Sequence, residues 1–275
     1  MFKSLLIYEF EKFWSKKINI ACFLVIPLIV FMALKGCIEL NPGYGIASPA
    51  FGTNMNFHII SLQEMIVSAF NGITIIFFAL SFNEEYQSGC LRMAFIRPIS
   101  IKKLYLAKTV ILIVNLFLIM LLQLLISLII AQIFLPTATK TLLFFKSGVY
   151  GAKGVIIYSF KFYLLSFINL LVLGAVTELF STRCKTVTGV IGGSLGFLVG
   201  SAVFFCIVIG RFKGIPESNS RYFMYASLSL IFTEFKGNAY FAAGVSNICL
   251  YSLIIMLIVF KVISFFRFTK KDYLE

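Results

Sequence analysis

Six long apolar runs dominate this sequence and leave it few ways to fold. Each is long enough to cross a hydrocarbon core about 30 Å thick. Water is absent from that core, so a crossing segment must be a helix or part of a closed barrel, and these runs do not alternate in polarity as barrel strands do. The composition agrees, with 60% hydrophobic residues, 13% charged residues and a mean hydropathy of +0.98. The chain is therefore predicted to be one all-α polytopic membrane domain, residues 1–275, with spans at about 18–34, 57–82, 105–135, 155–180, 187–210 and 244–266.

The basic residues predict the orientation of these spans. An even number of spans puts both termini on one side, and that side carries fifteen of the 24 Lys and Arg residues. The positive-inside rule makes it cytoplasmic. The same sorting explains the net charge of +13 better than nucleic-acid binding does, because the basic residues form no dense tract or reading motif.

Two short segments are predicted to lie along the membrane surface. Residues 1–17 place Phe2, Leu6, Phe10 and Phe13 near one helical face, with Glu9 close to it, and would be an anchor or a partner-docking helix at the cytoplasmic interface. Residues 222–232, within the extracellular segment 211–243, are apolar but too short to cross. They predict a short interfacial or re-entrant helix before the last span.

A charged connection, residues 84–103, separates the second and third spans. Glu84 and Glu85 open it, and Leu91, Ala94, Phe95 and Ile99 follow at helical spacing. Arg97-Pro98 then ends the helix. The pattern predicts a cytoplasmic helix parallel to the membrane, whose apolar ridge and charges suit docking to a partner.

This connection resembles the coupling loop of type-2 ABC exporter permeases. The resemblance rests on Glu84 or Glu85, Gly89, Leu91-Arg92, Arg97-Pro98-Ile99-Ser100 and Lys108, with Cys90 where Thr or Ser is common. It covers about 25 residues, and the six-span layout extends it over nearly the whole chain.

The resemblance implies a coupling helix that seats in a separate ATP-binding subunit. The residues it implies for that contact are Glu84, Glu85, Gly89, Leu91, Arg92, Phe95, Arg97, Pro98 and Ile99. This chain has no G-x-x-x-x-G-K-[ST] motif, so ATP and Mg would be bound by the partner and no cofactor by the chain itself. The expected assembly has two ATPase subunits and a second permease copy, or a related permease, in a bacterial plasma membrane. The expected cargo is an amphipathic or hydrophobic peptide toxin, antimicrobial peptide or drug.

Polar residues in the spans are candidates for a transport pathway. Ser61, Glu64, Ser68 and Asn71 recur at steps of three or four, which predicts one helical stripe, and Asn169 lies near the middle of the fourth span. An intramembrane carboxylate should face the bundle or a water-filled path. The stripe would line the pathway or form a packing network.

Small residues in the fifth span predict close helix packing or a moving gate. They are Gly189, Gly192, Gly193, Gly196 and Gly200.

No enzyme is predicted. His58 is the only His and Asp272 the only Asp, and the six Cys show no metal-ligand spacing. The alternative to the exporter is an ATP-independent channel or an ion-coupled carrier.

Overall fold

The computed structural model describes residues 2–45, 48–83, 100–184, 186–213 and 220–270. Six helical segments in these residues are long and apolar enough to cross a membrane, which confirms the predicted number of spans. The chain is an all-α polytopic membrane protein. The segments are α2 (Lys17–Leu40), the continuous run of α3 (Phe57–Met65), η2 (Ile66–Phe70) and α4 (Asn71–Phe82), α7 (Ile101–Phe134), α8 (Ala152–Arg183), α9 (Val187–Arg211) and α13 (Ile248–Lys270).

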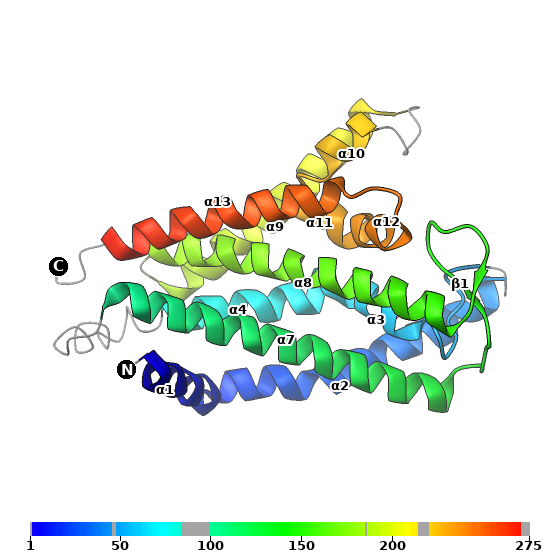
Figure 1. Cartoon of the computed structure of the whole chain (residues 1–275), viewed down its shortest axis with the longest axis horizontal. Helices are drawn as coiled ribbons and strands as arrows, with labels where there is room; N and C mark the ends of the chain where they lie inside the picture. Colours follow the sequence, from blue (N-terminus) through cyan, green and yellow to red (C-terminus); the bar gives the residue numbers. More distant parts are fainter. Residues whose placement is uncertain (1, 46–47, 84–99, 185, 214–219, 271–275) are drawn as a thin grey trace.

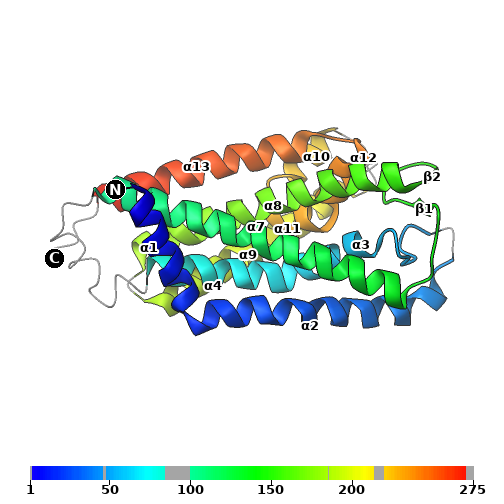
Figure 2. The same ribbon diagram turned by 60° about the horizontal axis from the view of Figure 1, so that its bottom comes forward.

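The long helices run along a common axis, and α8 lies at their centre (Figures 1 and 2). It contacts α4, α7, α9, α12 and α13. The last turn of α13 and the start of α7 lie at the same end of the bundle as α1, and we call this the terminal end (Figure 1). The opposite end carries the hairpin of β1 (Thr141–Leu142) and β2 (Val149–Tyr150), where Gly148 adopts a φ of 90°.

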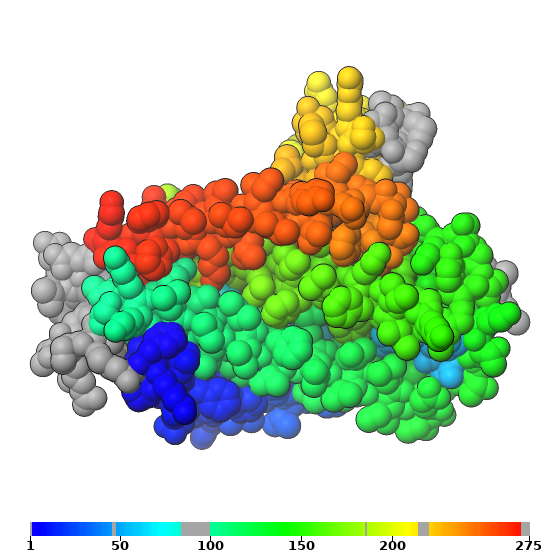
Figure 3. Space-filling model, in the orientation of Figure 1, coloured from blue at the N-terminus to red at the C-terminus, as the bar shows by residue number. Residues whose placement is uncertain are grey.

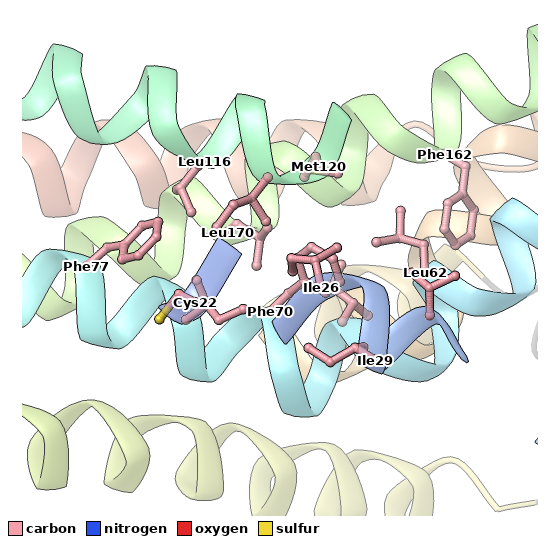
Figure 4. Close-up of a cluster of buried hydrophobic side chains, with 14 of the residues drawn as sticks. Cys22, Ile26, Ile29, Leu62, Phe70, Phe77, Leu116, Met120, Phe162 and Leu170 are labelled. Atoms are coloured by element: carbon pink, nitrogen blue, oxygen red, sulfur yellow. The ribbon is translucent and has the colours of Figure 1, made fainter. Parts of the chain in front are cut away.

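An apolar core joins the first four spans. Ile26, Phe70, Leu116 and Leu170 come from four different segments and are at most 1% exposed (Figure 4). Large apolar side chains also cover the outside of the bundle, where they would face lipid. The bundle therefore has an apolar interior and an apolar belt, as expected of helices that are hydrophobic on all faces.

Helix α1 (Phe2–Ser15) lies across the terminal end at a steep angle to the other helices (Figure 2). Its buried residues are Glu9 and Phe13, whereas Phe2 and Phe10 are exposed. The residues of the predicted apolar face are therefore divided between the bundle and the outer surface. Glu9 and Phe13 contact the bundle, and the exposed phenylalanines are available to lipid.

The segment before the last span differs from the single short helix expected over 222–232. It forms α10 (Ser220–Ala226), α11 (Leu230–Phe232), η3 (Thr233–Gly237) and α12 (Asn238–Ala243). The Ser229 hydroxyl caps α11 by accepting a hydrogen bond from the Phe232 amide, which breaks the predicted helix in two. Helix α10 projects from the bundle (Figure 3), whereas α12 packs against α8. Gly244 then ends α12 with a φ of 80°.

Candidate functional site

Two π-helical segments meet inside the bundle. One is η2, in the middle of the second span, and the other is η3, between α11 and α12, and the two are in contact. A π turn holds one extra residue, is rare, and is frequently found at functional sites. The contact between these segments therefore marks the first place to look for a site.

Glu234, on η3, is the most unusual side chain at this contact. It is completely buried, and its Oε2 accepts a hydrogen bond of 2.9 Å from Asn71 Nδ2. Its Oε1 and the Asn71 Oδ1 have no hydrogen-bond partner among the described residues. Burial raises the pKa of the Glu234 carboxyl to about 8, and the Asn71 hydrogen bond opposes this only in part. A protonated carboxyl would bring a donor to a place where two acceptors lack one.

A chain of hydrogen bonds connects the rest of this polar cluster to α8. Thr233 Oγ1 donates to Asn169 Oδ1 at 2.8 Å, and Asn169 Nδ2 donates to Asn238 Oδ1 at 3.1 Å. Asn238 Nδ2 donates in turn to Ser166 Oγ at 2.9 Å. The cluster thus joins the second span, the fourth span and the short helices before the last span.

The predicted pathway residues do not form one stripe. Asn71 and Asn169 belong to the Glu234 cluster, whereas Ser61 lies in a separate contact, accepting a hydrogen bond of 2.8 Å from Gln123 Nε2. Glu64 and Ser68 are exposed on the outside of the chain. The π turn of η2 shifts the helical phase between Ser61 and Asn71, whereas Glu64 precedes this turn and is already exposed on α3.

Glu234, Thr233 and Asn238 are absent from the sequence-based candidates, because residues 211–243 were assigned to an extracellular segment. The sequence nevertheless contains a pattern that points to these residues. Glu234 and Asn238 are four residues apart within an otherwise mostly apolar run, which places both on one helical face.

The predicted glycines divide into two groups. A Cβ at Gly193 would lie 2.9 Å from the Phe180 ring and one at Gly189 would lie 3.1 Å from Thr186 Oγ1, so these two pack within the chain. A Cβ at Gly192, Gly196 or Gly200 would meet nothing within 4 Å. These three form an unoccupied small-residue face of α9, and close packing there would need another molecule.

Ion pairs brace the terminal end of the bundle. Lys108 Nζ lies 3.0 Å from Glu9 Oε2 and also donates to the Ser81 carbonyl at 3.3 Å, although Lys108 and Glu9 are only 1% and 5% exposed. These contacts join α1, α4 and α7. Lys16 Nζ adds a second link by donating to the Leu80 carbonyl at 3.0 Å.

A second buried carboxylate joins α7 to two further helices, α8 and α13, at this end. Glu178 on α8 accepts a hydrogen bond of 2.8 Å from the Tyr105 hydroxyl of α7 and is paired with Lys261 of α13. The terminal end is therefore held together by two carboxylates, each shared between helices that are far apart in the sequence.

The predicted coupling residues lie outside the described residues. Residues 84–99 contain Glu84, Glu85, Gly89, Leu91, Arg92, Phe95, Arg97, Pro98 and Ile99. Their described neighbours are Asn83, whose Nδ2 donates to the Cys184 carbonyl at 3.3 Å, and Ser100, directly before α7. Both ends of the connection are thus attached to the braced end of the bundle.

No group of three or more His, Cys, Asp or Glu residues that could hold a metal ion occurs in the part of the chain that the structure describes.

Comparison with known proteins identifies a family. The chain matches none of the curated proteins. Residues 45–274 match the model of a family described as a protein of unknown function, DUF2705. That match covers five of the six spans, the connection 84–99 and the Glu234 cluster, so the chain belongs to the DUF2705 family.

Proposed function

We propose that this chain is the permease subunit of an ATP-driven exporter and that a separate ATP-binding subunit drives it through residues 84–99. The observation that carries the proposal is the braced terminal end. The connection leaves the bundle between α4 and α7, where Lys108 ties α7 to α1 and to Ser81. Tyr105 ties α7 to Glu178 and so to α8 and α13. A push on the connection would therefore move several helices together instead of bending one loop.

The proposal gives the Glu234 cluster the role of a gate. Helix α4 runs from the braced end to η2 over 12 residues, which is about 18 Å at 1.5 Å per residue. Motion of α4 would reach Asn71 and its bond to Glu234. π turns are frequently found at functional sites, which supports a role for η2 in this motion.

A second copy of the chain, or a related permease, completes the proposed pathway. The open small-residue face of α9 at Gly192, Gly196 and Gly200 supports this, because such faces allow two membrane helices to approach closely. Two ATP-binding subunits would match two permeases.

On the basis of the resemblance we place the assembly in a bacterial plasma membrane, and the distribution of Lys and Arg favours both termini in the cytoplasm. The proposed cargo is an amphipathic or hydrophobic compound, such as a peptide toxin, an antimicrobial peptide or a drug.

Affinity purification with a candidate ATP-binding subunit tests the proposal. The tagged wild type should recover the partner and its ATPase activity, whereas a Glu85→Lys, Arg97→Glu variant should lose both. The matched control is Lys35→Glu, Glu39→Lys, which reverses an exposed ion pair on α2 at 3.9 Å and should keep the complex. Equal recovery by all three proteins would contradict coupling through this connection. A wild-type chain that transports without ATP would contradict the exporter itself.

The buried carboxyl of Glu234 favours one second candidate, an ion-coupled carrier. Uptake into vesicles driven by a proton gradient without ATP, and abolished in Glu234→Gln, would support the carrier. Dependence on ATP, with Glu234→Gln changing only the rate, would support the exporter.

A further inference from the structure

The loop of the β1–β2 hairpin reaches toward α12, the last short helix before α13 (Figure 1). The ring of Phe145, in this loop, stacks on the ring of Tyr240 in α12, with the ring centroids 3.9 Å apart and 21° between the planes. Phe145 is 45% exposed, whereas Tyr240 is only 6% exposed. Phe145 therefore covers α12 from the outside and joins it to a segment far away in the sequence.

A second contact links the same loop to α12 through α8. The Tyr158 hydroxyl of α8 lies 3.3 Å from the Phe144 carbonyl oxygen and 3.5 Å from the Ala239 carbonyl oxygen. Both distances are long for hydrogen bonds of a hydroxyl, so these bonds are weak. The Phe145–Tyr240 stack is therefore the strongest of these contacts between the hairpin loop and α12.

The backbone of Phe145 opposes this attachment. Its φ of 58° lies in the left-handed region, and among the described residues it is the only residue other than glycine with a positive φ. A bulky side chain is strained there, and the strain is comparable with the stabilisation from one aromatic pair. The hairpin adds little stability of its own, because it consists of two residue pairs, Thr141 with Tyr150 and Leu142 with Val149. The docked loop is therefore held by opposing contributions of similar size.

Helix α12 also carries part of the Glu234 cluster. Asn238, its first residue, is completely buried and is hydrogen-bonded to Asn169 and Ser166 of α8. Asn238 and Tyr240 are two residues apart in α12, so their side chains point to nearly opposite sides of the helix. Helix α12 therefore lies between α8, which it contacts through the cluster, and the hairpin loop, which it contacts through Tyr240.

We propose that the hairpin loop, residues 143–148, is a clasp that holds α12 against α8 and keeps the Glu234 cluster buried. While Phe145 lies on Tyr240, α12 stays packed and the cluster is closed. When the ring leaves, the backbone strain at Phe145 is relieved and α12 can move away from α8. The use of the clasp in transport rests on the gate proposed above, whereas the clasp itself acts in the resting chain without ATP or a partner subunit.

Two native cysteines can report whether α12 moves. Cys249 of α13 is completely buried, and a Cβ at Gly237, directly before α12, would lie 3.2 Å from its Sγ. Cys206 of α9 is exposed and serves as the reference. Modification of the purified full-length chain by N-ethylmaleimide, followed by peptide mass spectrometry, gives the rate at Cys249 relative to Cys206. Hydrogen exchange of the peptide that covers residues 233–243 gives a second readout that does not depend on thiols.

The variants separate the Phe145 ring from the rest of the loop. Phe145→Ala should raise the Cys249 rate and the exchange of residues 233–243 by about twofold to tenfold, the range that corresponds to one aromatic pair. Phe145→Tyr keeps the ring and should behave as the wild type. Lys146→Ala is the matched control, because Lys146 lies 4.4 Å from the ring centroid of Tyr150 within the hairpin, and it should change neither readout. In a Tyr240→Ala background, Phe145→Ala should have no further effect.

Three outcomes would overturn the clasp. They are no increase in Phe145→Ala, an equal increase in Lys146→Ala, and an increase of the same size in all helices, which would mean that the whole chain opens and not α12 alone. The clasp and its use in transport can fail separately. Faster exchange of residues 233–243 in Phe145→Ala, together with unchanged transport, would support the clasp and contradict its role in the proposed gate.

Discussion

Glu234 illustrates how a single side chain can define the interior of this bundle. It is a carboxyl with no exposure, one hydrogen bond from Asn71 and one oxygen without a partner among the described residues. Burying an ionised carboxylate in such a place is expensive, and protonation removes the cost. We therefore expect the hydrogen bonding of the cluster to depend on the protonation of Glu234.

The pH dependence of stability should report on Glu234. Its pKa is about 8 in the folded chain against 4.5 for the unperturbed group, so the folded state binds the extra proton between these values. The free energy of unfolding should therefore fall as pH rises from about 5 to 8 and level off above that. Glu234→Gln should abolish this slope in thermal unfolding followed in detergent. Glu39→Gln, at an exposed carboxyl on α2, should keep it. A wild-type slope in Glu234→Gln would contradict the assignment.

Helix α1 is the element whose attachment depends most on one contact. The Glu9–Lys108 pair is buried at 3.0 Å and joins residues 99 positions apart. Glu9 lies close to the apolar face of an otherwise amphipathic helix, and the ion pair explains this irregularity.

A double-mutant cycle measures how much the Glu9–Lys108 pair contributes to the free energy of unfolding. Lys108→Met leaves the Glu9 carboxylate buried without this cation and should cost about 3–5 kcal/mol of unfolding free energy, measured by denaturation in detergent. Glu9→Gln combined with Lys108→Met should recover much of the loss, because no buried charge remains at the pair.

The exposed pair Lys35–Glu39 on α2 provides the control for this cycle. Its side chains are 74% and 67% exposed, so breaking it should cost at most about 1 kcal/mol. Strict additivity of the Glu9 and Lys108 variants would show that the two residues do not stabilise each other.

At the scale of the whole molecule, the two ends of the bundle differ in construction. The terminal end is braced by the carboxylates of Glu9 and Glu178, whereas the opposite half holds the Glu234 cluster and the hairpin loop that contacts α12. The small-residue face of α9 is open, since a Cβ at Gly192, Gly196 or Gly200 would meet nothing within 4 Å. This division is consistent with the function we propose, in which the terminal end is driven by a partner and the other end opens.

Assembly should depend on the α9 face. A Cβ at Gly196 would meet no described atom within 4 Å, so Gly196→Leu should keep the melting temperature of the monomer, whereas the proposed dimer should be lost in light scattering or cross-linking. Gly193→Leu should behave in the opposite way. Its side chain would collide with Phe180, 2.9 Å from the Cβ position, and should cost about 1–3 kcal/mol of stability. A dimer that persists in Gly196→Leu would rule out this face as the contact.

The membrane class, the number of spans and their approximate positions follow from the sequence alone, because span length and hydrophobicity are local properties imposed by the bilayer. A local pattern also marks the helix at residues 2–15. The prediction of a single helix over 222–232 was wrong. The Ser229 cap and the π turn of η3, which break this segment, depend on packing against the bundle. The prediction of one stripe from Ser61 to Asn71 was also wrong, because Glu64 faces outward on α3 and the π turn of η2 shifts the helical phase before Asn71. Which polar groups meet, as in Glu234 with Asn71, Glu9 with Lys108 and His58 with Ser159, was decided only by the tertiary structure, because each pair joins residues far apart along the chain.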